Sequence, residues 1–349
     1  MSEPAQAPLA SVVVGWQAVH GRSHLPWQHT RDPYRVWLSE IMLQQTQVTT
    51  VLGYYARFLE RFPDVASLAS ATEDEVMALW SGLGYYSRAR NLHRCAQQVV
   101  QLHGGRFPAS AQVLQTLAGI GRSTAGAIAA FCFSERVAIL DANVRRVLTR
   151  VLGFDGDLSV AENERALWDL ATGLLPEDNL EQAMPRYTQG LMDLGATVCL
   201  PRKPLCLVCP LQPRCVAFQH SQPERYPVRT RKLVRKAETW WLLLLRDRAA
   251  ARIWLERRPA KGIWAGLYSL PVYASQSALL EHPAVSSARG CTALPAFVHV
   301  LTHRDLHLHP VSVEVSFPDS SHADAGWFAR DQWQAMGLPA PIRKLLDAL

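Results

Sequence analysis

Residues 199–215 read CLPRKPLCLVCPLQPRC and hold four of the seven cysteines of the chain. Their spacing is Cys199-x6-Cys206-x2-Cys209-x5-Cys215, and the four prolines between them oppose a regular helix. Four thiolates gathered in one stiff loop can surround an iron–sulfur cluster. The sequence therefore favours a cluster-binding loop with these four cysteines as its ligands.

Two other roles for the cysteines stay open. Zinc sites usually combine two close cysteine pairs, and only Cys206 and Cys209 form such a pair. Disulfides need an oxidising compartment, whereas Cys95, Cys132 and Cys291 stand singly in apolar surroundings. We therefore place a cluster first, zinc second and disulfides third, and expect a reducing cytoplasm.

Length and composition agree with that location. The chain has 349 residues, of which 48% are hydrophobic, and no apolar run reaches the roughly 18 residues that a membrane span needs. Its first residues, MSEPAQAPLA, lack the basic start and apolar stretch of a secretory signal. We expect a soluble, cytoplasmic protein with no membrane partner. The net charge of +6 is compatible with a polyanionic partner but does not establish one.

The hydrophobic pattern changes along the chain. Apolar residues recur at helical spacing through residues 1–221, which predicts a mainly α region. Residues 222–236 are rich in Arg and Lys and are interpreted as a basic linker, either solvated or touching phosphate. Residues 237–349 change to a strand-like period, which predicts an α+β domain. Its expected strands are Trp240–Leu245, Ala251–Glu256 and Val311–Phe317, and its closing helix is Pro341–Leu349.

A glycine-containing turn stands at residues 117–128, LAGIGRSTAGAI. Gly119 and Gly121 allow close backbone approach, and the helix that follows offers N–H groups to a phosphate, so the turn is suited to hold DNA. An ordinary tight turn between packed helices is the alternative. Asp141 precedes another amphipathic helix, where a carboxylate commonly caps the first turn.

The hairpin, the aspartate after it and the cysteine loop occur together in this order. The combination resembles the helix-hairpin-helix DNA glycosylases related to endonuclease III. The strings LPW at 25–27, WLSEIMLQQTQ at 37–47 and GLGYYSRARNL at 82–92 narrow the resemblance to the adenine glycosylases of that superfamily. It implies a base-excision-repair enzyme, probing double-stranded DNA as a monomer, that removes adenine mispaired with 8-oxoguanine or guanine. The implied cofactor is one [4Fe-4S] cluster on the four cysteines, with no further small-molecule cofactor.

The resemblance also assigns two catalytic residues. Glu40 is the acid that protonates adenine at N7 and later handles the water, while Asp141 stays ionised beside the positively charged sugar. Apolar neighbours of Glu40 are expected to raise its pKa, and helix N–H groups beside Asp141 favour its anion. In a chain without this resemblance, Glu40 would be interpreted as a surface helix residue and Asp141 as a helix cap.

The same resemblance implies DNA contacts in the helical region. Tyr85 matches the wedge that enters the base stack, and amide side chains after Glu40 are suited to base edges. Trp27 and Val48 would line the adenine pocket, with core packing as their alternative role. The implied DNA-contacting residues are Leu25, Trp27, Gln44, Gln45, Thr46, Val48, Leu83, Tyr85, Gly119, Gly121, Ser123, Asn143 and Gln189.

Ser123 departs from endonuclease III, which has a lysine nucleophile at the matching position. Without an amine, no Schiff base forms with the sugar, so we expect a monofunctional glycosylase. A bifunctional enzyme acting on pyrimidine lesions is one alternative. A non-enzymatic DNA-binding or electron-transfer protein is another, and the pair of Glu40 and Asp141 argues against it.

The C-terminal domain resembles the Nudix fold through RRP at 257–259 and GIWAGLY at 262–268. Nudix hydrolases hold magnesium with a glutamate-rich helix, yet Glu281 is the only acidic residue between Pro259 and Gly290. We therefore expect lesion recognition in place of hydrolysis. The residues matching the family's lesion-probing loop are Leu301, Thr302 and His303. Two other departures are alanines: Ala118 where proline is usual and Ala142 where glycine is common.

Overall fold

The structure is a computed structural model that describes residues 7–230, 234–247, 251–286, 290–315 and 324–349. The chain forms two compact units. The first comprises residues 1–51, 64–69 and 94–232, and the second comprises residues 52–63, 70–93 and 233–349. Two early segments of the chain thus belong with the C-terminal part. The division at residues 221 and 237 that the hydrophobic pattern indicates stays a prediction.

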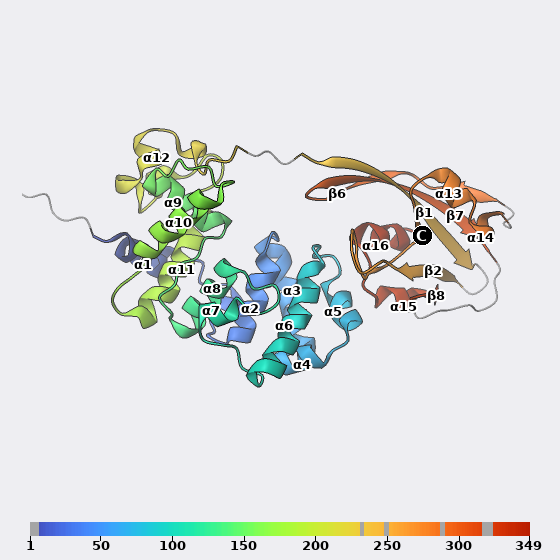
Figure 1. Cartoon of the computed structure of the whole chain (residues 1–349), viewed down its shortest axis with the longest axis horizontal. Helices are drawn as coiled ribbons and strands as arrows, with labels where there is room; N and C mark the ends of the chain where they lie inside the picture. The colour runs from blue at the N-terminus through green and yellow to red at the C-terminus, as the bar shows by residue number, and fades with distance from the viewer. Residues whose placement is uncertain (1–6, 231–233, 248–250, 287–289, 316–323) are drawn as a thin grey trace, which may run out of the picture. The chain divides into compact units, whose positions relative to one another are not determined.

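The first unit is helical, and two of its helices, α3 and α6, continue into the second unit. Its longest helix, α11, contacts α1, α8 and α9, so it forms the centre of the helical packing (Figure 1). The helices are α1 Leu9–His20, α2 Pro33–Leu43, α3 Val48–Arg61, α4 Val65–Ser70, α6 Ser87–His103, α7 Ala111–Leu114, α8 Arg122–Phe133, α9 Ala142–Leu152, α10 Ala161–Gly173, α11 Leu180–Thr197 and α12 Val216–Gln219. Short 3-10 turns occupy Pro26–Gln28, Cys206–Val208, Gln212–Arg214 and Pro223–Arg225.

Local sequence explains why α8 begins where it does. Gly119 has a φ of 76°, in the left-handed region that glycine adopts readily, and it turns the chain ahead of the helix. Ala118 donates its N–H to Oε1 of Gln98 at 2.7 Å. The proline usual at this position has no N–H, so the alanine anchors the hairpin by a contact that proline could not make.

The start of α9 is fixed from two sides. The Asp141 carboxylate accepts the N–H of Val144 at 2.7 Å, which caps the first turn. Gly195 on α11 lies against Asn143. A Cβ atom added at Gly195 would lie only 2.5 Å from the Cβ of Asn143. The absence of a side chain at Gly195 therefore lets α11 pack closely against the start of α9.

The second unit contains a mixed sheet. Among the described strands, β1 lies beside β7 and runs parallel to it, from the pair Lys236 and Arg304 to the pair Arg246 and Glu314 (Figure 1). The central order is β3-β2-β1-β7-β5. In addition β4 pairs with β1, β6 with β7 and β8 with β2. The strands are β1 Lys236–Asp247, β2 Arg252–Arg257, β3 Tyr268–Ser269, β4 Val272–Tyr273, β5 Cys291–Ala293, β6 Phe297–Val300, β7 Arg304–Glu314 and β8 Ala325–Phe328. The helices of this unit are α5 Glu73–Trp80, α13 Gln276–Leu280, α14 Pro283–Ser286, α15 Arg330–Gln334 and α16 Ala340–Asp347.

Residues 70–93 join the second unit through polar contacts. The Arg257 guanidinium binds the Asp74 carboxylate through two hydrogen bonds of 3.0 and 2.7 Å. The Tyr86 hydroxyl donates to the carbonyl of Leu338 at 2.8 Å. The loop after α5 is therefore held against the sheet domain, and any role of Tyr85 depends on that domain.

The expected elements of the C-terminal domain are found, with different bounds. β7 begins at Arg304, ahead of the expected start at Val311, because alternate residues from Leu306 onward are already buried. Ser316 and Phe317, the end of the expected strand, lie outside the described residues. In the basic linker, Arg231 and Lys232 lie outside them too, while Lys236 already starts β1. No helix of the described residues is both long and apolar enough to cross a membrane.

Candidate active site

A cavity of about 720 Å³ in the first unit collects most of the residues singled out in the helical region. It lies among the end of α2, the start of α3, the hairpin before α8, the start of α9 and the middle of α11. The expected residues that line it are Leu25, Trp27, Glu40, Gln44, Gln45, Thr46, Val48, Ser123, Asp141, Asn143 and Gln189. Residues distant in the sequence thus share one concave site.

Glu40 lies near the end of α2, between the buried residues Ser39 and Ile41. Burial and, to a smaller extent, the nearby charge of Asp141 raise the pKa of its carboxyl group to about 8. An ordinary glutamate has a pKa near 4.5, so burial accounts for most of the change. Glu40 is therefore protonated at neutral pH and can serve as an acid.

Asp141 has opposing influences on its pKa. Burial raises it, and the N–H groups of Val144 and Asn143 together with the charges of Arg146 and Arg145 lower it. The net pKa is above the ordinary value of 3.8. The helix N–H groups do favour the anion as expected, but loss of hydration outweighs them, because the carboxylate lies inside the protein.

Ser123 uses its hydroxyl for structure. Its Oγ accepts the N–H of Leu140 at 3.1 Å, which holds the chain just before Asp141. Among the described residues that line the cavity there is no lysine. Position 123 therefore carries a hydrogen-bond acceptor that fixes the segment before Asp141.

The chain turns sharply after α2. Gln45 adopts a φ of 56°, which is uncommon for a residue with a side chain. The Gln44 side chain donates to the Thr124 hydroxyl at 3.5 Å, so this turn is tied to the start of α8. Trp27 is 7% exposed, which makes it both a core residue and part of the cavity wall.

The remaining expected residues lie elsewhere. Tyr85, Thr302 and His303 line a separate cavity of about 510 Å³ in the second unit, together with Trp264. The hydroxyl groups of Tyr85 and Thr302 are 2.6 Å apart and share a hydrogen bond. Leu83 is 6% exposed, so its side chain is packed inside in this structure. Gly119 and Gly121 lie in the hairpin and line neither cavity.

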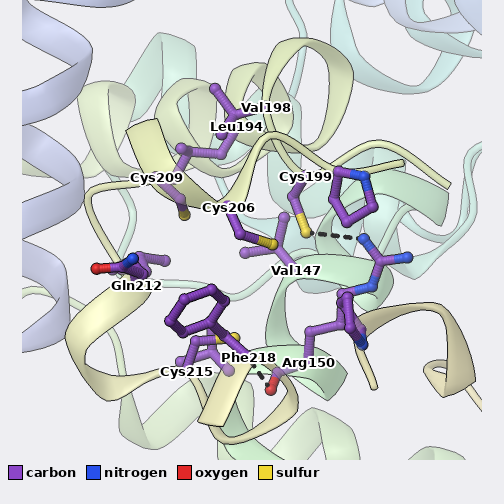
Figure 2. Close-up of a pocket in the computed structure, with 14 residues that line it drawn as sticks. Val147, Arg150, Leu194, Val198, Cys199, Cys206, Cys209, Gln212, Cys215 and Phe218 are labelled. Carbon is purple, nitrogen blue, oxygen red and sulfur yellow. Dashed lines mark hydrogen bonds between the residues drawn. The ribbon is translucent and has the colours of Figure 1, made fainter. Parts of the chain in front are cut away.

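The four cysteines of the loop converge on one small cavity between the loop and α9. Figure 2 shows Cys199, Cys206, Cys209 and Cys215 surrounding it, with Val147 and Phe218 among the apolar wall residues. All seven cysteines are free thiols, so the disulfide alternative is not realised. Within the described part of the chain, no three His, Cys, Asp or Glu residues lie as ligands of a single metal ion would.

Two arginines one turn apart on α9 hold the cysteine loop. Arg146 donates to the carbonyl oxygens of Cys199 at 2.7 Å and Gly195 at 2.6 Å. Arg150 donates to the carbonyl of Leu200 at 2.7 Å, and its guanidinium lies 3.3 Å from the Cys199 sulfur (Figure 2). The helix that Asp141 caps thus also carries the supports of the loop.

The cysteine loop carries three cationic side chains, two of which are exposed. Arg202 and Lys203 are exposed, but Arg214 is half-buried and donates to the carbonyl of Ala7 at 2.6 Å. Arg214 is therefore engaged in holding the N-terminal segment.

Sequence reasoning missed several residues of the site. Arg22, Thr124, Met192 and Ala196 line the cavity, and Asp193 lies directly behind Gln189. The spacing of Gln189 and Asp193, four residues apart on one helix, could have indicated their contact. Arg22 carries no comparable local signal, because it reaches Asp193 only through the packing of α1 on α11.

Comparisons with known proteins agree with this architecture. Residues 38–172 match the HhH-GPD superfamily of base excision DNA repair proteins, and residues 240–348 match the NUDIX domain. The chain is similar to the adenine DNA glycosylase of Buchnera aphidicola subsp. Acyrthosiphon pisum, at 33% identity over 345 residues that cover 97% of each chain. It is 46% identical to that of Mus musculus over 208 residues, covering 57% of this chain and 39% of the mouse protein. A solved thermostable thymine-DNA glycosylase matches with a TM-score of 0.53 and 29% identity, covering 60% of this chain and 95% of its own.

The helical fold and the two matched families define a base-excision DNA glycosylase with an appended NUDIX domain. Because the similarity to an adenine DNA glycosylase extends over nearly all of both chains, the chain belongs to the adenine DNA glycosylase (MutY) family. It is an adenine DNA glycosylase of base excision repair. The fold class, family and enzyme class expected from the sequence are confirmed.

Proposed function

We propose that this glycosylase removes adenine paired with 8-oxoguanine or guanine, with Glu40 as the acid and Asp141 as the stabilising anion. The observation that carries the proposal is that Glu40 and Asp141 line one cavity, in which burial raises the pKa of Glu40. Two carboxyl groups with different proton affinities are the combination that glycosidic bond cleavage uses.

The reaction proceeds in two stages. Glu40 transfers its proton to N7 of the flipped adenine, and the C1′–N9 bond breaks with its electron pair going to the base. The sugar then carries positive charge, which the carboxylate of Asp141 stabilises at close range. A water molecule adds its oxygen to C1′, and Glu40, now a carboxylate, accepts the proton that the water loses.

The same site supports base release without strand cleavage. A lyase step needs an amine that attacks C1′, and Ser123 offers a hydroxyl already used as an acceptor for Leu140. No lysine lines this cavity among the described residues. We therefore assign a monofunctional mechanism, which leaves an abasic site in an intact strand.

Recognition of the base opposite adenine is assigned to the cavity of the second unit. Tyr85 is 44% exposed and directly follows Gly84, which like Gly82 has a positive φ, and this suits a ring that enters the base stack. Thr302 and His303 offer a hydroxyl and an imidazole beside it. These polar groups are suited to the edge of an oxidised purine, in which N7 carries a proton.

We assign a [4Fe-4S] cluster to the four cysteines of the loop. The four thiols surround one cavity, and their spacing in the sequence contains one close pair instead of the two pairs usual in zinc sites. The Arg150 guanidinium near Cys199 would offset the negative charge of bound thiolates. When bound, the cluster supplies rigidity to the loop, and no step of base release depends on it.

A duplex labelled on the adenine strand tests this function. The enzyme is incubated with A opposite 8-oxoguanine, and the strand is analysed with and without alkali. Strand breaks that appear only after alkali treatment support a monofunctional glycosylase. Breaks without alkali, together with a protein–DNA adduct trapped by borohydride, would show a lyase and contradict the mechanism.

A further inference from the structure

The buried carboxylate of Asp193 lies behind the candidate adenine site. Its side chain is 0% exposed, and both oxygens accept hydrogen bonds. Oδ1 accepts from Nε of Arg22 at 2.6 Å and from Nε2 of Gln189 at 2.9 Å. Oδ2 accepts the backbone N–H of Arg22 at 3.0 Å. Arg22 therefore fixes the position of the carboxylate, and the carboxylate in turn binds Gln189.

This contact decides which way the Gln189 amide points. A carboxylate only accepts hydrogen bonds, so the NH2 end of the amide must face Asp193. The carbonyl Oε1 is then the end left for a ligand, and it accepts no hydrogen bond from the other residues that the structure describes. Gln189 lines the cavity that Glu40 and Asp141 share, so a fixed acceptor stands in the site.

We propose that Asp193 is a positioning residue that holds the Gln189 carbonyl toward the 6-amino group of adenine. The proposal rests on the function assigned above. The 6-amino group of adenine donates hydrogen bonds, whereas the 6-oxo group of hypoxanthine or guanine accepts them. A fixed carbonyl binds the amino group and opposes an oxo group, so Asp193 sets the specificity for adenine through Gln189.

Arg22 makes this arrangement stable. A buried carboxylate without a partner is strongly disfavoured, and the Arg22 guanidinium provides the compensating charge. Because Arg22 lies just after α1 and Asp193 lies on α11, the packing of these two helices keeps the pair together. The amide orientation is thus fixed before any base enters.

The test compares single-turnover release of three bases opposite 8-oxoguanine: adenine, unsubstituted purine, which lacks the amino group, and hypoxanthine. The wild-type protein is compared with Gln189→Leu, Asp193→Ala and the double variant. We expect the adenine-to-purine rate ratio to fall about tenfold in each single variant, because each loses one hydrogen bond to the base. The ratio should fall no further in the double variant, because both changes remove the same contact.

A purely structural role of Asp193 predicts a different result. Loss of packing would slow release of adenine and purine alike, leaving their ratio as in the wild type, and this outcome overturns the proposal. Should Asp193→Ala not fold, Asp193→Leu serves instead, because leucine has a similar shape and accepts no hydrogen bond. The adenine-to-purine ratio should again fall about tenfold. An unchanged ratio in a folded Asp193→Leu protein also overturns the proposal.

These outcomes are separate from the fate of the assigned function. If the wild-type protein releases no adenine, the assigned function fails. If it releases adenine but the variants keep the wild-type ratios, only the role of Asp193 fails.

Discussion

The charge of Asp141 raises the pKa of Glu40, adding to the larger effect of burial. The two carboxyl groups share one cavity, so they do not both ionise easily. Burial raises the pKa of both groups, but at Asp141 the N–H group of Val144 and the charges of two arginines oppose it, whereas nothing opposes it at Glu40. When one of the two groups is protonated, the proton therefore lies on Glu40, which is the residue that must donate it.

The rate of adenine release should depend on pH in a defined direction. Glu40 must be protonated to act as an acid, so the single-turnover rate should fall as pH rises through about 8. At low pH the rate should fall again as Asp141 gains a proton, beginning above the ordinary range for an aspartate because its pKa is raised. Rates measured from pH 4 to about 10 check both limbs. A rate that stays constant through pH 8 to 10 would count against Glu40 as the acid.

Glu40 should also make the fold less stable at high pH. Its pKa is about 8 in the folded protein and near 4.5 when exposed, so the folded state binds more protons between these values. By linkage, the stability present below pH 4.5 is lost as pH rises toward 8. Glu40→Gln removes this titration and should be more stable than wild type at pH 8, by on the order of a few kcal/mol.

Denaturant unfolding at pH 5, 7 and about 9 measures this difference. The exposed Glu177 provides a matched control, because Glu177→Gln changes the same group without burial. The free energy of unfolding of Glu40→Gln, relative to wild type, should increase with pH, whereas that of Glu177→Gln should not. Equal pH dependence in both variants would be inconsistent with a buried acid at position 40.

The sequence predicts the site residues that belong to its motifs, but not those that reach the site only through tertiary packing. Glu40 and Asp141 could be named because their surrounding strings are specific, although the cap on α9 alone would have indicated a structural aspartate. The spacing of Asp193 from Gln189 could have indicated their contact, but the pairing of Asp193 with Arg22 could not be predicted, because Arg22 reaches it from the segment after α1. The hydrogen bond between Tyr85 and Thr302 could not be predicted either, because residues 70–93 join the C-terminal part only through tertiary contacts.

Thr302 should affect lesion preference more than chemistry. Its hydroxyl bonds the Tyr85 hydroxyl, and Thr302→Val removes this group while keeping the volume. We expect the preference for A opposite 8-oxoguanine over A opposite guanine to fall about fivefold, as for one hydrogen bond. Thr302→Ser keeps the hydroxyl and should keep the preference. Rates on the two duplexes provide the measurement, and equal preferences in all three proteins would remove Thr302 from lesion readout.

Metal analysis of the purified protein shows whether the four cysteines bind an iron–sulfur cluster or a zinc ion. A [4Fe-4S] cluster predicts about four iron atoms and four inorganic sulfides per chain, with no stoichiometric zinc. Cys206→Ser should lower the iron content and the stability of the loop, whereas Cys291→Ser, outside the loop and exposed, should change neither. One zinc per chain with no iron would contradict the cluster assignment.

The central claim is that Glu40 and Asp141 perform base release in a site that other residues assemble. Glu40→Gln and Asp141→Asn change charge and proton donation with little change in volume, so each should still bind a duplex with A opposite 8-oxoguanine. The most direct measurement is the single-turnover rate of adenine release by both variants at saturating enzyme, with duplex affinity measured in parallel. We predict near wild-type affinity and a rate lowered by about 10²-fold or more. Near wild-type release by either variant would contradict the account.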